Sequence, residues 1–140
     1  MSDLRGLFVR PKSLKEVSRK GSSFDEVRPY ILEFLDEFYV EQVPEKKVAM
    51  LKEEPDVSGD ARMDAYLAAV AEYLSRIYDL DPPDWVEGET RFLKRPFFPC
   101  GLESLKATML KESPAAFRRR MIFVEATPLY RPRKDKVGIG

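Results

Sequence analysis

Apolar residues recur at helical spacing along most of the chain, and residues with capping chemistry precede these stretches. In the segment SFDEVRPYILEFLDEFYVEQ, Ser23 and Glu26 fit a capping box, and Pro29 has the chemistry of a first helical position. We therefore predict a lead-in turn followed by a helix over 29–41, with a longer helix kinked at Pro29 as the alternative. Its apolar stripe consists of Phe24, Val27, Ile31, Phe34, Leu35 and Phe38.

Two further helices follow in the acidic middle of the chain. Pro44 is placed to begin a short helix, PEKKVAMLKEE, with Val48 and Leu51 directed inward. Asp60 is placed to cap the most regular helix, predicted over 61–79, in which alanines would let a neighbouring helix approach closely. Its apolar stripe consists of Met63, Tyr66, Leu67, Val70, Leu74, Ile77 and Tyr78.

The last third of the chain is less regular. The segment DWVEGETRFLKRPFFPCG is rich in aromatic residues and proline, which favours a packed connection over the core. A helix LESLKATMLKE follows, with Leu102, Leu105, Met109 and Leu110 predicted to face inward. Ser113 and Pro114 then have the chemistry of a new helix start, PAAFRRR, and MIFVEATPLY is typical of extended structure, either paired with another edge or lying against the helices.

These patterns predict a mainly α fold. We expect a compact bundle of about four to six helices, with an irregular aromatic and proline-rich connection and one short C-terminal extended segment. The predicted organisation is a basic N-terminal arm over 1–22, a single helical domain over 23–130 and a basic C-terminal tail over 131–140.

Composition narrows the classes of function. The chain has 140 residues, 44% of them apolar, no histidine and one cysteine, so imidazole ligands, proton shuttles and internal disulfides are missing. Cys100 is expected to be a small buried apolar residue. Glycine-rich phosphate loops, a nucleophile elbow and calcium-loop spacing of carboxylates are also missing, so we predict a binding protein without cofactor or metal rather than an enzyme. Because no long apolar run and no signal peptide is present, we expect a cytoplasmic protein without a membrane partner.

The net charge of zero hides a strong segregation along the chain. Residues 1–23 carry six basic and two acidic groups, residues 24–90 carry six and eighteen, and residues 91–140 carry twelve and four. The basic ends could bind nucleic acid, could face an acidic protein, or could fold back over the acidic middle of the same molecule.

The arginine run Arg118, Arg119 and Arg120 is the most distinctive local feature. At the end of a short helix these cations could stabilise the last carbonyls or pair with the acidic middle, with one packed inward and another facing solvent. Guanidinium groups also suit recognition of a partner's carboxylates or phosphates. The residues that we predict to bind a partner are Arg118, Arg119, Arg120, Phe97, Phe98, Arg131 and Arg133.

Four blocks of the sequence resemble one family. The blocks EFLDEFY (33–39), DAYLAAVAEYL (64–74), PDWVEGETRFLKRPFF (83–98) and ESPAAFRRRMIFV (112–124) are similar to small bacterial proteins encoded beside nucleotidyltransferase-like toxins and regarded as their antitoxins. The resemblance implies an inhibitor that covers the toxin's nucleotide and metal cleft. Either the arginine run and basic arms would occupy that cleft, whose carboxylates hold Mg²⁺, or the acidic middle would mimic RNA phosphates.

Other functions remain open from the sequence. The basic termini with Phe97, Phe98 and Phe123 could serve a nucleic-acid-binding accessory or regulatory protein, although the acidic middle would repel phosphate. A carboxylate enzyme that uses a divalent ion is the third class, and homodimer formation is compatible with each of them.

Overall fold

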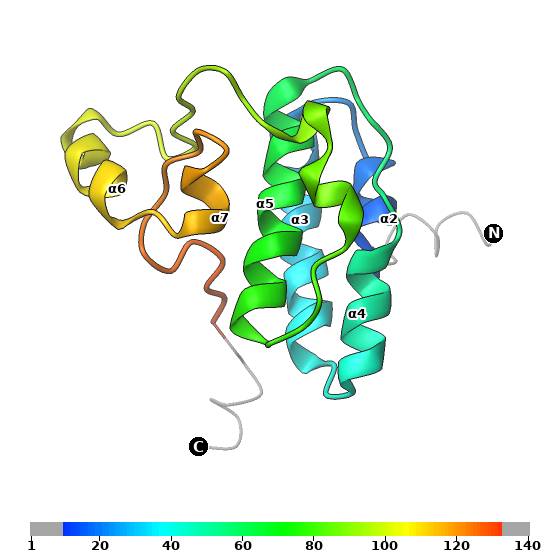
Figure 1. Cartoon of the computed structure of the whole chain (residues 1–140). Helices are drawn as coiled ribbons and strands as arrows, with labels where there is room; N and C mark the ends of the chain where they lie inside the picture. Colours follow the sequence, from blue (N-terminus) through cyan, green and yellow to red (C-terminus); the bar gives the residue numbers. More distant parts are fainter. Residues whose placement is uncertain (1–9, 133–140) are drawn as a thin grey trace.

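The computed structural model describes residues 10–132, and it confirms the mainly α fold (Figure 1). Its α-helices are α2 (Leu14–Ser18), α3 (Phe24–Val40), α4 (Pro44–Lys52), α5 (Ala61–Ile77), α6 (Lys106–Glu112) and α7 (Ala115–Arg118). Three short 3₁₀ turns join them, η1 (Asp84–Glu87), η2 (Glu89–Arg91) and η3 (Glu103–Leu105). The one β-bridge among these residues links Phe97 and Ile122.

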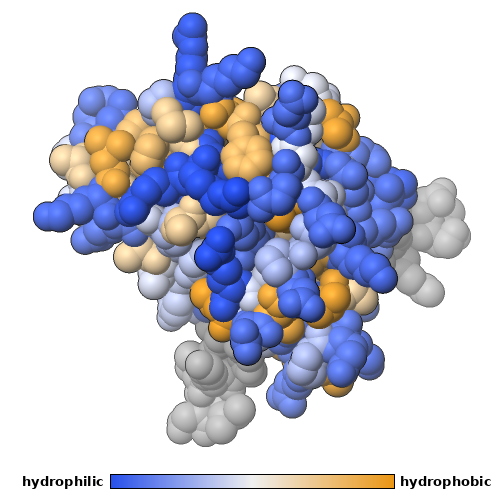
Figure 2. Space-filling model, in the orientation of Figure 1, coloured by the Kyte–Doolittle hydropathy of each residue, from blue (hydrophilic) through white to orange (hydrophobic). Residues whose placement is uncertain are grey.

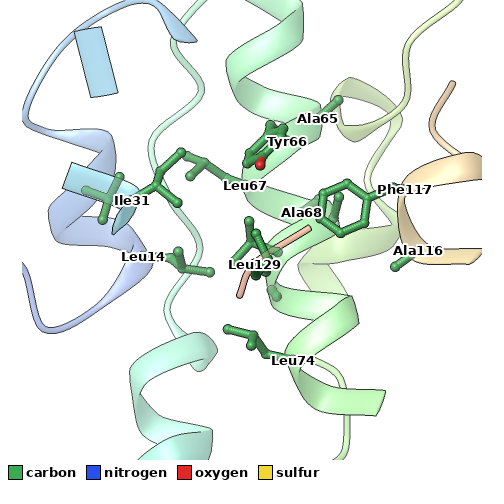
Figure 3. Close-up of a cluster of buried hydrophobic side chains, with 14 of the residues drawn as sticks. Leu14, Ile31, Ala65, Tyr66, Leu67, Ala68, Leu74, Ala116, Phe117 and Leu129 are labelled. Carbon is green, nitrogen blue, oxygen red and sulfur yellow. The ribbon is translucent and has the colours of Figure 1, made fainter. Parts of the chain in front are cut away.

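Helix α5 is the centre of the molecule. It lies beside α3, η1 and η2 pack along it, and α7 covers another of its faces, with α6 further out (Figure 1). Most of its residues are buried, including ten consecutive ones from Met63 to Glu72. Figure 3 shows Leu67 and Leu74 of α5 among side chains from the rest of the chain, with Phe117 of α7 close to Ala68. The small alanines allow these close approaches.

Local cap chemistry sets where α3 and α5 begin. Ser23 Oγ accepts a hydrogen bond from the Glu26 amide at 3.2 Å, and Glu26 Oε1 accepts one from the Ser22 amide at 2.8 Å. Asp60 Oδ1 accepts from the Arg62 amide at 3.0 Å, which confirms the predicted cap of α5. Free amides at a helix start are satisfied in this way.

Two predicted helix boundaries were wrong. Helix α3 begins at Phe24 rather than at Pro29, which lies inside it. Burial of Phe24 and Val27, together with the cap, holds the first turns even though Pro29 has no N–H to donate. Helix α5 ends at Ile77, which is 52% exposed instead of facing the core, whereas the Tyr78 ring still meets the buried Phe38 ring edge-on at 5.5 Å.

The segment predicted as the basic arm 1–22 contains helix α2. Leu14 and Val17 are fully buried in the core, and Ser13 caps the helix by accepting from the Glu16 amide at 3.1 Å. Two apolar residues three positions apart bury one face of a single turn, which is too short a pattern to stand out in sequence. Residues 1–9 of that predicted arm lie outside the described residues.

The apolar stripe predicted for 102–112 was also largely wrong. Only Met109 is buried, whereas Leu102, Leu105 and Leu110 are 55%, 41% and 49% exposed. Helix α6 lies at the edge of the molecule (Figure 1), and Leu110 within it and Leu102 and Leu105 just before it are exposed to solvent. Cys100 is exposed rather than buried, in a turn where Gly101 has a φ of +75°.

The C-terminal extended segment pairs with the aromatic connection, one of the two arrangements predicted for it. The Phe97 amide donates to Met121 O at 2.8 Å and the Phe123 amide donates to Phe97 O at 2.9 Å. Further on, Leu129 is buried in the main core, and Tyr39 Oη donates to its carbonyl at 2.8 Å. The chain therefore returns to α3 before the described residues end.

Within residues 10–132, every helix is too short or too polar to cross a lipid bilayer.

Candidate functional site

Ion pairs join the basic ends of the chain to its acidic middle. On the N-terminal side, Arg10 pairs with Glu37, and Lys15 and Arg19 both pair with Asp56. On the C-terminal side, the pairs are Arg91–Glu54, Arg119–Glu72, Arg119–Glu87, Arg120–Glu72 and Arg131–Asp36. The charge segregation in the sequence is thus matched in part inside the molecule, as in the third of the explanations given for it above.

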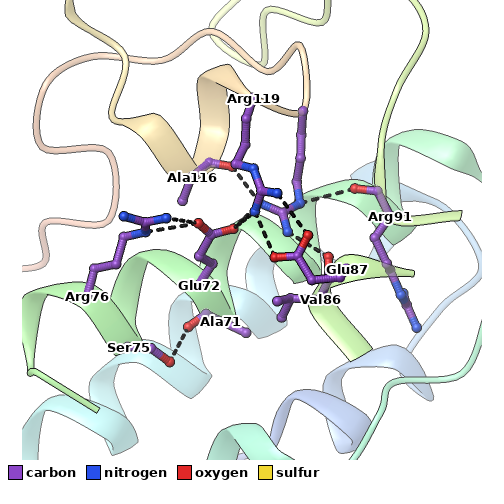
Figure 4. A network of polar contacts seen from close by, with 10 residues as sticks. Ala71, Glu72, Ser75, Arg76, Val86, Glu87, Arg91, Ala116 and Arg119 are labelled. Atoms are coloured by element: carbon purple, nitrogen blue, oxygen red, sulfur yellow. Dashed lines mark hydrogen bonds and ion pairs between the residues drawn. The ribbon is translucent and has the colours of Figure 1, made fainter. Parts of the chain in front are cut away.

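Glu72 of α5 is the centre of a buried ionic cluster (Figure 4). Its Oε1 accepts hydrogen bonds from Arg120 at 2.6 Å and from Arg119 at 2.7 Å. Its Oε2 accepts two from Arg76, at 2.9 and 2.6 Å. Only 2% of Glu72 is exposed to solvent, so these three guanidinium groups replace the water that the carboxylate loses.

The cluster shifts the ionisation of Glu72. Burial alone would raise the pKa of this carboxyl, but hydrogen bonds from Arg120, Arg76 and Arg119 outweigh it and lower the pKa from 4.5 to about 2. Glu87 also has a lowered pKa, because Arg119 donates to both of its oxygens, at 2.8 and 3.0 Å. Both carboxylates are therefore charged at neutral pH.

The three arginines of the run have three different positions. Arg120 is fully buried and donates to the carbonyls of Arg91, Ala116 and Val86 at 3.1, 2.8 and 2.7 Å, as well as to Glu72. Arg119 is partly exposed but bound to Glu72 and Glu87. Arg118 is exposed and donates to Lys111 O at 2.8 Å. A partner can thus reach Arg118, whereas Arg120 is buried and binds groups inside the protein.

The other residues predicted to bind a partner are dispersed. Phe97 is buried, and its ring meets that of Phe24 edge-on at 5.2 Å. Phe98 is half-buried and stacks on Phe123 at 5.3 Å. Arg131 forms two hydrogen bonds with Asp36, both at 3.1 Å. Arg133 lies outside the described residues. The described members of the set have separate partners and do not form one site.

Arg91 is a buried cation whose role the sequence analysis missed. It donates to Asp64 O at 3.2 Å, to Pro55 O at 2.7 Å and to Glu54 at 3.1 Å, and its guanidinium lies 4.9 Å from the Trp85 ring. Its Nε is a buried atom without a hydrogen-bond partner. Together with Arg120, it fixes the segment 84–93 against α5 and against the loop that precedes α5.

Those two fixed segments enclose a cleft of about 580 Å³. One wall is the start of α5 with the loop before it, and the other is the chain from Glu89 to Pro96. The lining residues are Val57, Gly59, Ala61, Arg62, Asp64, Glu89, Thr90, Phe92, Leu93, Lys94, Arg95 and Pro96. We refer to this feature as the 57–96 cleft.

The 57–96 cleft combines an apolar lining with cations that the rest of the described chain leaves unpaired. Arg62, Lys94 and Arg95 are exposed and form no ion pair with any residue in 10–132. The Arg62 guanidinium lies 4.5 Å from the Phe97 ring, close enough for a cation–π interaction. Val57, Phe92, Leu93 and Pro96 supply apolar surface between these charges.

The acidic groups at the 57–96 cleft differ in availability. Asp64 is buried and accepts from the Ser58 amide at 3.0 Å and from Ser58 Oγ at 2.8 Å, so its charge is used within the protein. Glu89 is exposed. The available groups therefore favour an anionic ligand.

A second hollow, of about 690 Å³, has a different character. It is lined by Val48, Lys52, Glu54, Asp81, Pro82, Pro83, Asp84 and Trp85. Here the carboxylates outnumber the single lysine, and Glu54 already pairs with Arg91. Exposed leucines form a third feature, over α6 at the upper left of Figure 2, in the same orientation as Figure 1.

No activity is assigned by a metal site in the described residues or by similarity to known proteins. Within the described range, no three His, Cys, Asp or Glu side chains come together in a way that could hold a metal ion. Comparisons of the chain with protein-family models, curated proteins and solved structures found no match. The 57–96 cleft has both an apolar lining and three cations without ion pairs in the described chain. We take it as the candidate site.

Proposed function

We propose that this protein is an antitoxin that neutralises a nucleotidyltransferase-type toxin by protein contact. The observation that carries the proposal is the 57–96 cleft, in which Arg62, Lys94 and Arg95 are unpaired beside apolar side chains. Such a combination suits contact with an acidic protein surface, because carboxylates can pair with the cations while apolar groups fill the cleft. We take the identity of the partner from the resemblance of the four sequence blocks to antitoxins, which is part of the proposal.

The proposal moves the contact from the arginine run to the 57–96 cleft. Arg119 and Arg120 are engaged with Glu72, so using them against a partner would mean breaking a buried cluster. Lys94 and Arg95 require no such rearrangement. In a toxin whose cleft holds Mg²⁺ on carboxylates, they would lie against those acidic groups and exclude metal and nucleotide.

The proposal predicts that a neighbouring gene encodes a nucleotidyltransferase-like toxin, and the test is co-expression of this protein with that neighbour. The wild-type protein should restore growth and co-elute with the toxin as a stable complex. A K94E/R95E double variant should lose both, because like charges would then face each other. A K12E/K46E double variant changes net charge equally at exposed positions outside the 57–96 cleft, and it should behave as wild type. A folded K94E/R95E protein that still protects would refute the proposed contact.

A second candidate, binding of nucleic acid, is favoured by the cation and aromatic pairs near Phe98. The Lys106 ammonium lies 5.0 Å from the Phe98 ring, and Phe98 and Phe123 are stacked. Bases stack on such rings, and phosphates bind such cations. Binding of a single-stranded oligonucleotide that weakens steeply with salt and is lost in K106E would favour this candidate over the antitoxin.

A further inference from the structure

The walls of the 57–96 cleft are fixed before any ligand binds. Asp60 Oδ2 accepts from the Phe24 amide at 2.7 Å, and Ser58 Oγ lies within hydrogen-bond distance of both Asp60 O and Asp64. On the opposite wall, the Leu93 amide donates to Arg120 O at 3.4 Å, and Arg91 is held between α5 and Pro55. A ligand would therefore meet a shaped surface, and little ordering of the chain would oppose binding.

The size and lining of the cleft limit what it can hold. About 580 Å³ is within the range of pockets that hold small ligands or a few side chains. Phe92, Leu93 and Val57 offer apolar contact, and Arg62, Lys94 and Arg95 are spread along both walls. A ligand that satisfies both features has an apolar part with negative charges on either side of it.

The surroundings favour a peptide over a nucleic acid strand. The loop that leads to the cleft carries exposed Glu53, and exposed Glu89 lies on the other wall; neither carboxylate forms an ion pair within residues 10–132. A strand of phosphates that extended past the cleft would run along these carboxylates and be repelled. A short segment can place its few charges only where the cations are.

We propose that the 57–96 cleft binds a short acidic peptide segment that places an apolar side chain against the apolar lining at Val57 and Leu93 while its carboxylates pair with Arg62, Lys94 and Arg95. The inference rests on the proposed function in that the segment would belong to the toxin. It assigns the chemistry of the bound segment, which the antitoxin role alone does not specify.

Selection from a random peptide display library tests this without the toxin. Full-length protein is immobilised, and the enriched peptides should carry Asp or Glu around a Leu, Ile or Phe. An enriched peptide, synthesised with a fluorescent label, should bind K94E/R95E at least about tenfold more weakly, because charge-assisted hydrogen bonds are lost. The same peptide should bind K12E/K46E as it binds wild type.

A second variant examines the apolar part of the cleft. Val57 is 55% exposed, so V57E should fold normally, and its carboxylate should repel the acidic peptide and weaken binding by a similar factor. Enriched peptides without carboxylates, equal binding to K94E/R95E, or no enrichment would each overturn the inference. The alternative result is an oligonucleotide that displaces the acidic peptide from the wild-type protein and fails to bind K94E/R95E. That result would assign the cleft to nucleic acid.

The two proposals fail separately in these experiments. Acidic peptides selected by the cleft, with no growth protection in co-expression, would leave the peptide site standing and reject the antitoxin role. Growth protection that persists in K94E/R95E would leave the antitoxin role standing and reject the cleft as its contact.

Discussion

The buried guanidinium of Arg120 donates a 2.6 Å hydrogen bond to the buried carboxylate of Glu72, 48 residues away in the chain. The pair joins the end of α7 to the middle of α5, and the remaining Arg120 donors satisfy backbone carbonyls from three segments. A buried ion pair gains little over apolar packing, but the loss of one partner is expensive. Removal of the Arg120 side chain should therefore destabilise the whole fold.

Replacing Arg120 and Arg118 separately should give very different stabilities. R120A removes a fully buried cation and leaves three carbonyls without their donor, so we expect a loss of about 3–5 kcal/mol in the free energy of unfolding. R118A removes an exposed side chain, and it should change this free energy by less than about 0.5 kcal/mol. Urea unfolding followed by circular dichroism measures both. Equal effects of the two substitutions would contradict the buried position of Arg120.

Glu72 should make the protein sensitive to acid. Its pKa is lowered to about 2 in the folded state from an ordinary value of 4.5, so its contribution is complete above about pH 4.5 and is lost as the pH falls towards 2. At 1.36 kcal/mol per pKa unit, that contribution is about 3 kcal/mol. Carboxyl resonances in an NMR titration should show Glu72 still ionised at a pH where exposed glutamates are already protonated.

The E72Q variant is the control for this pH dependence. It should lose stability at neutral pH, because Arg120 keeps its buried charge without a counter-charge, and its stability should fall less between pH 5 and 3 than that of the wild type. Glu87 has a pKa shifted in the same direction by Arg119, so part of the acid sensitivity should remain. A Glu72 resonance that titrates near 4.5 would contradict the cluster described above.

The sequence was most informative where structure depends on neighbours in the chain. The cap of α5 at Asp60 and the start of α4 at Pro44 were predicted correctly, because both follow from side chains within a few residues. Distant contacts decided the rest. Which arginine of the run turns inward depends on Glu72 and on Met121, whose φ of +64° redirects the chain after α7.

Burial on helix α6 shows a second limit. Leu102, Leu105 and Met109 have helical spacing that predicts a core face, yet only Met109 is buried. A face is buried only if another element lies opposite it, and periodicity does not report that. The 57–96 cleft was missed for a related reason. Arg62 and Lys94 are far apart in sequence, in segments that were assigned to an ordinary helix and to a packed connection, and only their shared cleft distinguishes them from surface charges.

Ser113 should be important as a buried link rather than as the predicted helix cap. Pro114 occupies the N-cap position of α7, and Ser113 Oγ instead lies within hydrogen-bond distance of Met109 O at 2.6 Å and of Val124 O at 3.0 Å, while it accepts from the Val124 amide at 2.8 Å. S113A leaves the buried Val124 amide without this partner, which should cost about 1–3 kcal/mol. The exposed Ser104 provides a matched control, and S104A should leave the unfolding midpoint unchanged.

Asp60 should couple the starts of α3 and α5. One carboxylate oxygen accepts from the Arg62 amide at 3.0 Å and the other from the Phe24 amide at 2.7 Å, so a single side chain satisfies free amides of two helices. Loss of an N-cap lowers the free energy of unfolding by about 0.5–2 kcal/mol. The loss in D60A should reach or exceed the upper end of this range, because two hydrogen bonds are removed. D60N keeps an oxygen for only one of these amides and should recover part of the difference. Hydrogen exchange should accelerate at both Arg62 and Phe24 in D60A, and acceleration at Arg62 alone would show that Asp60 caps α5 without joining it to α3.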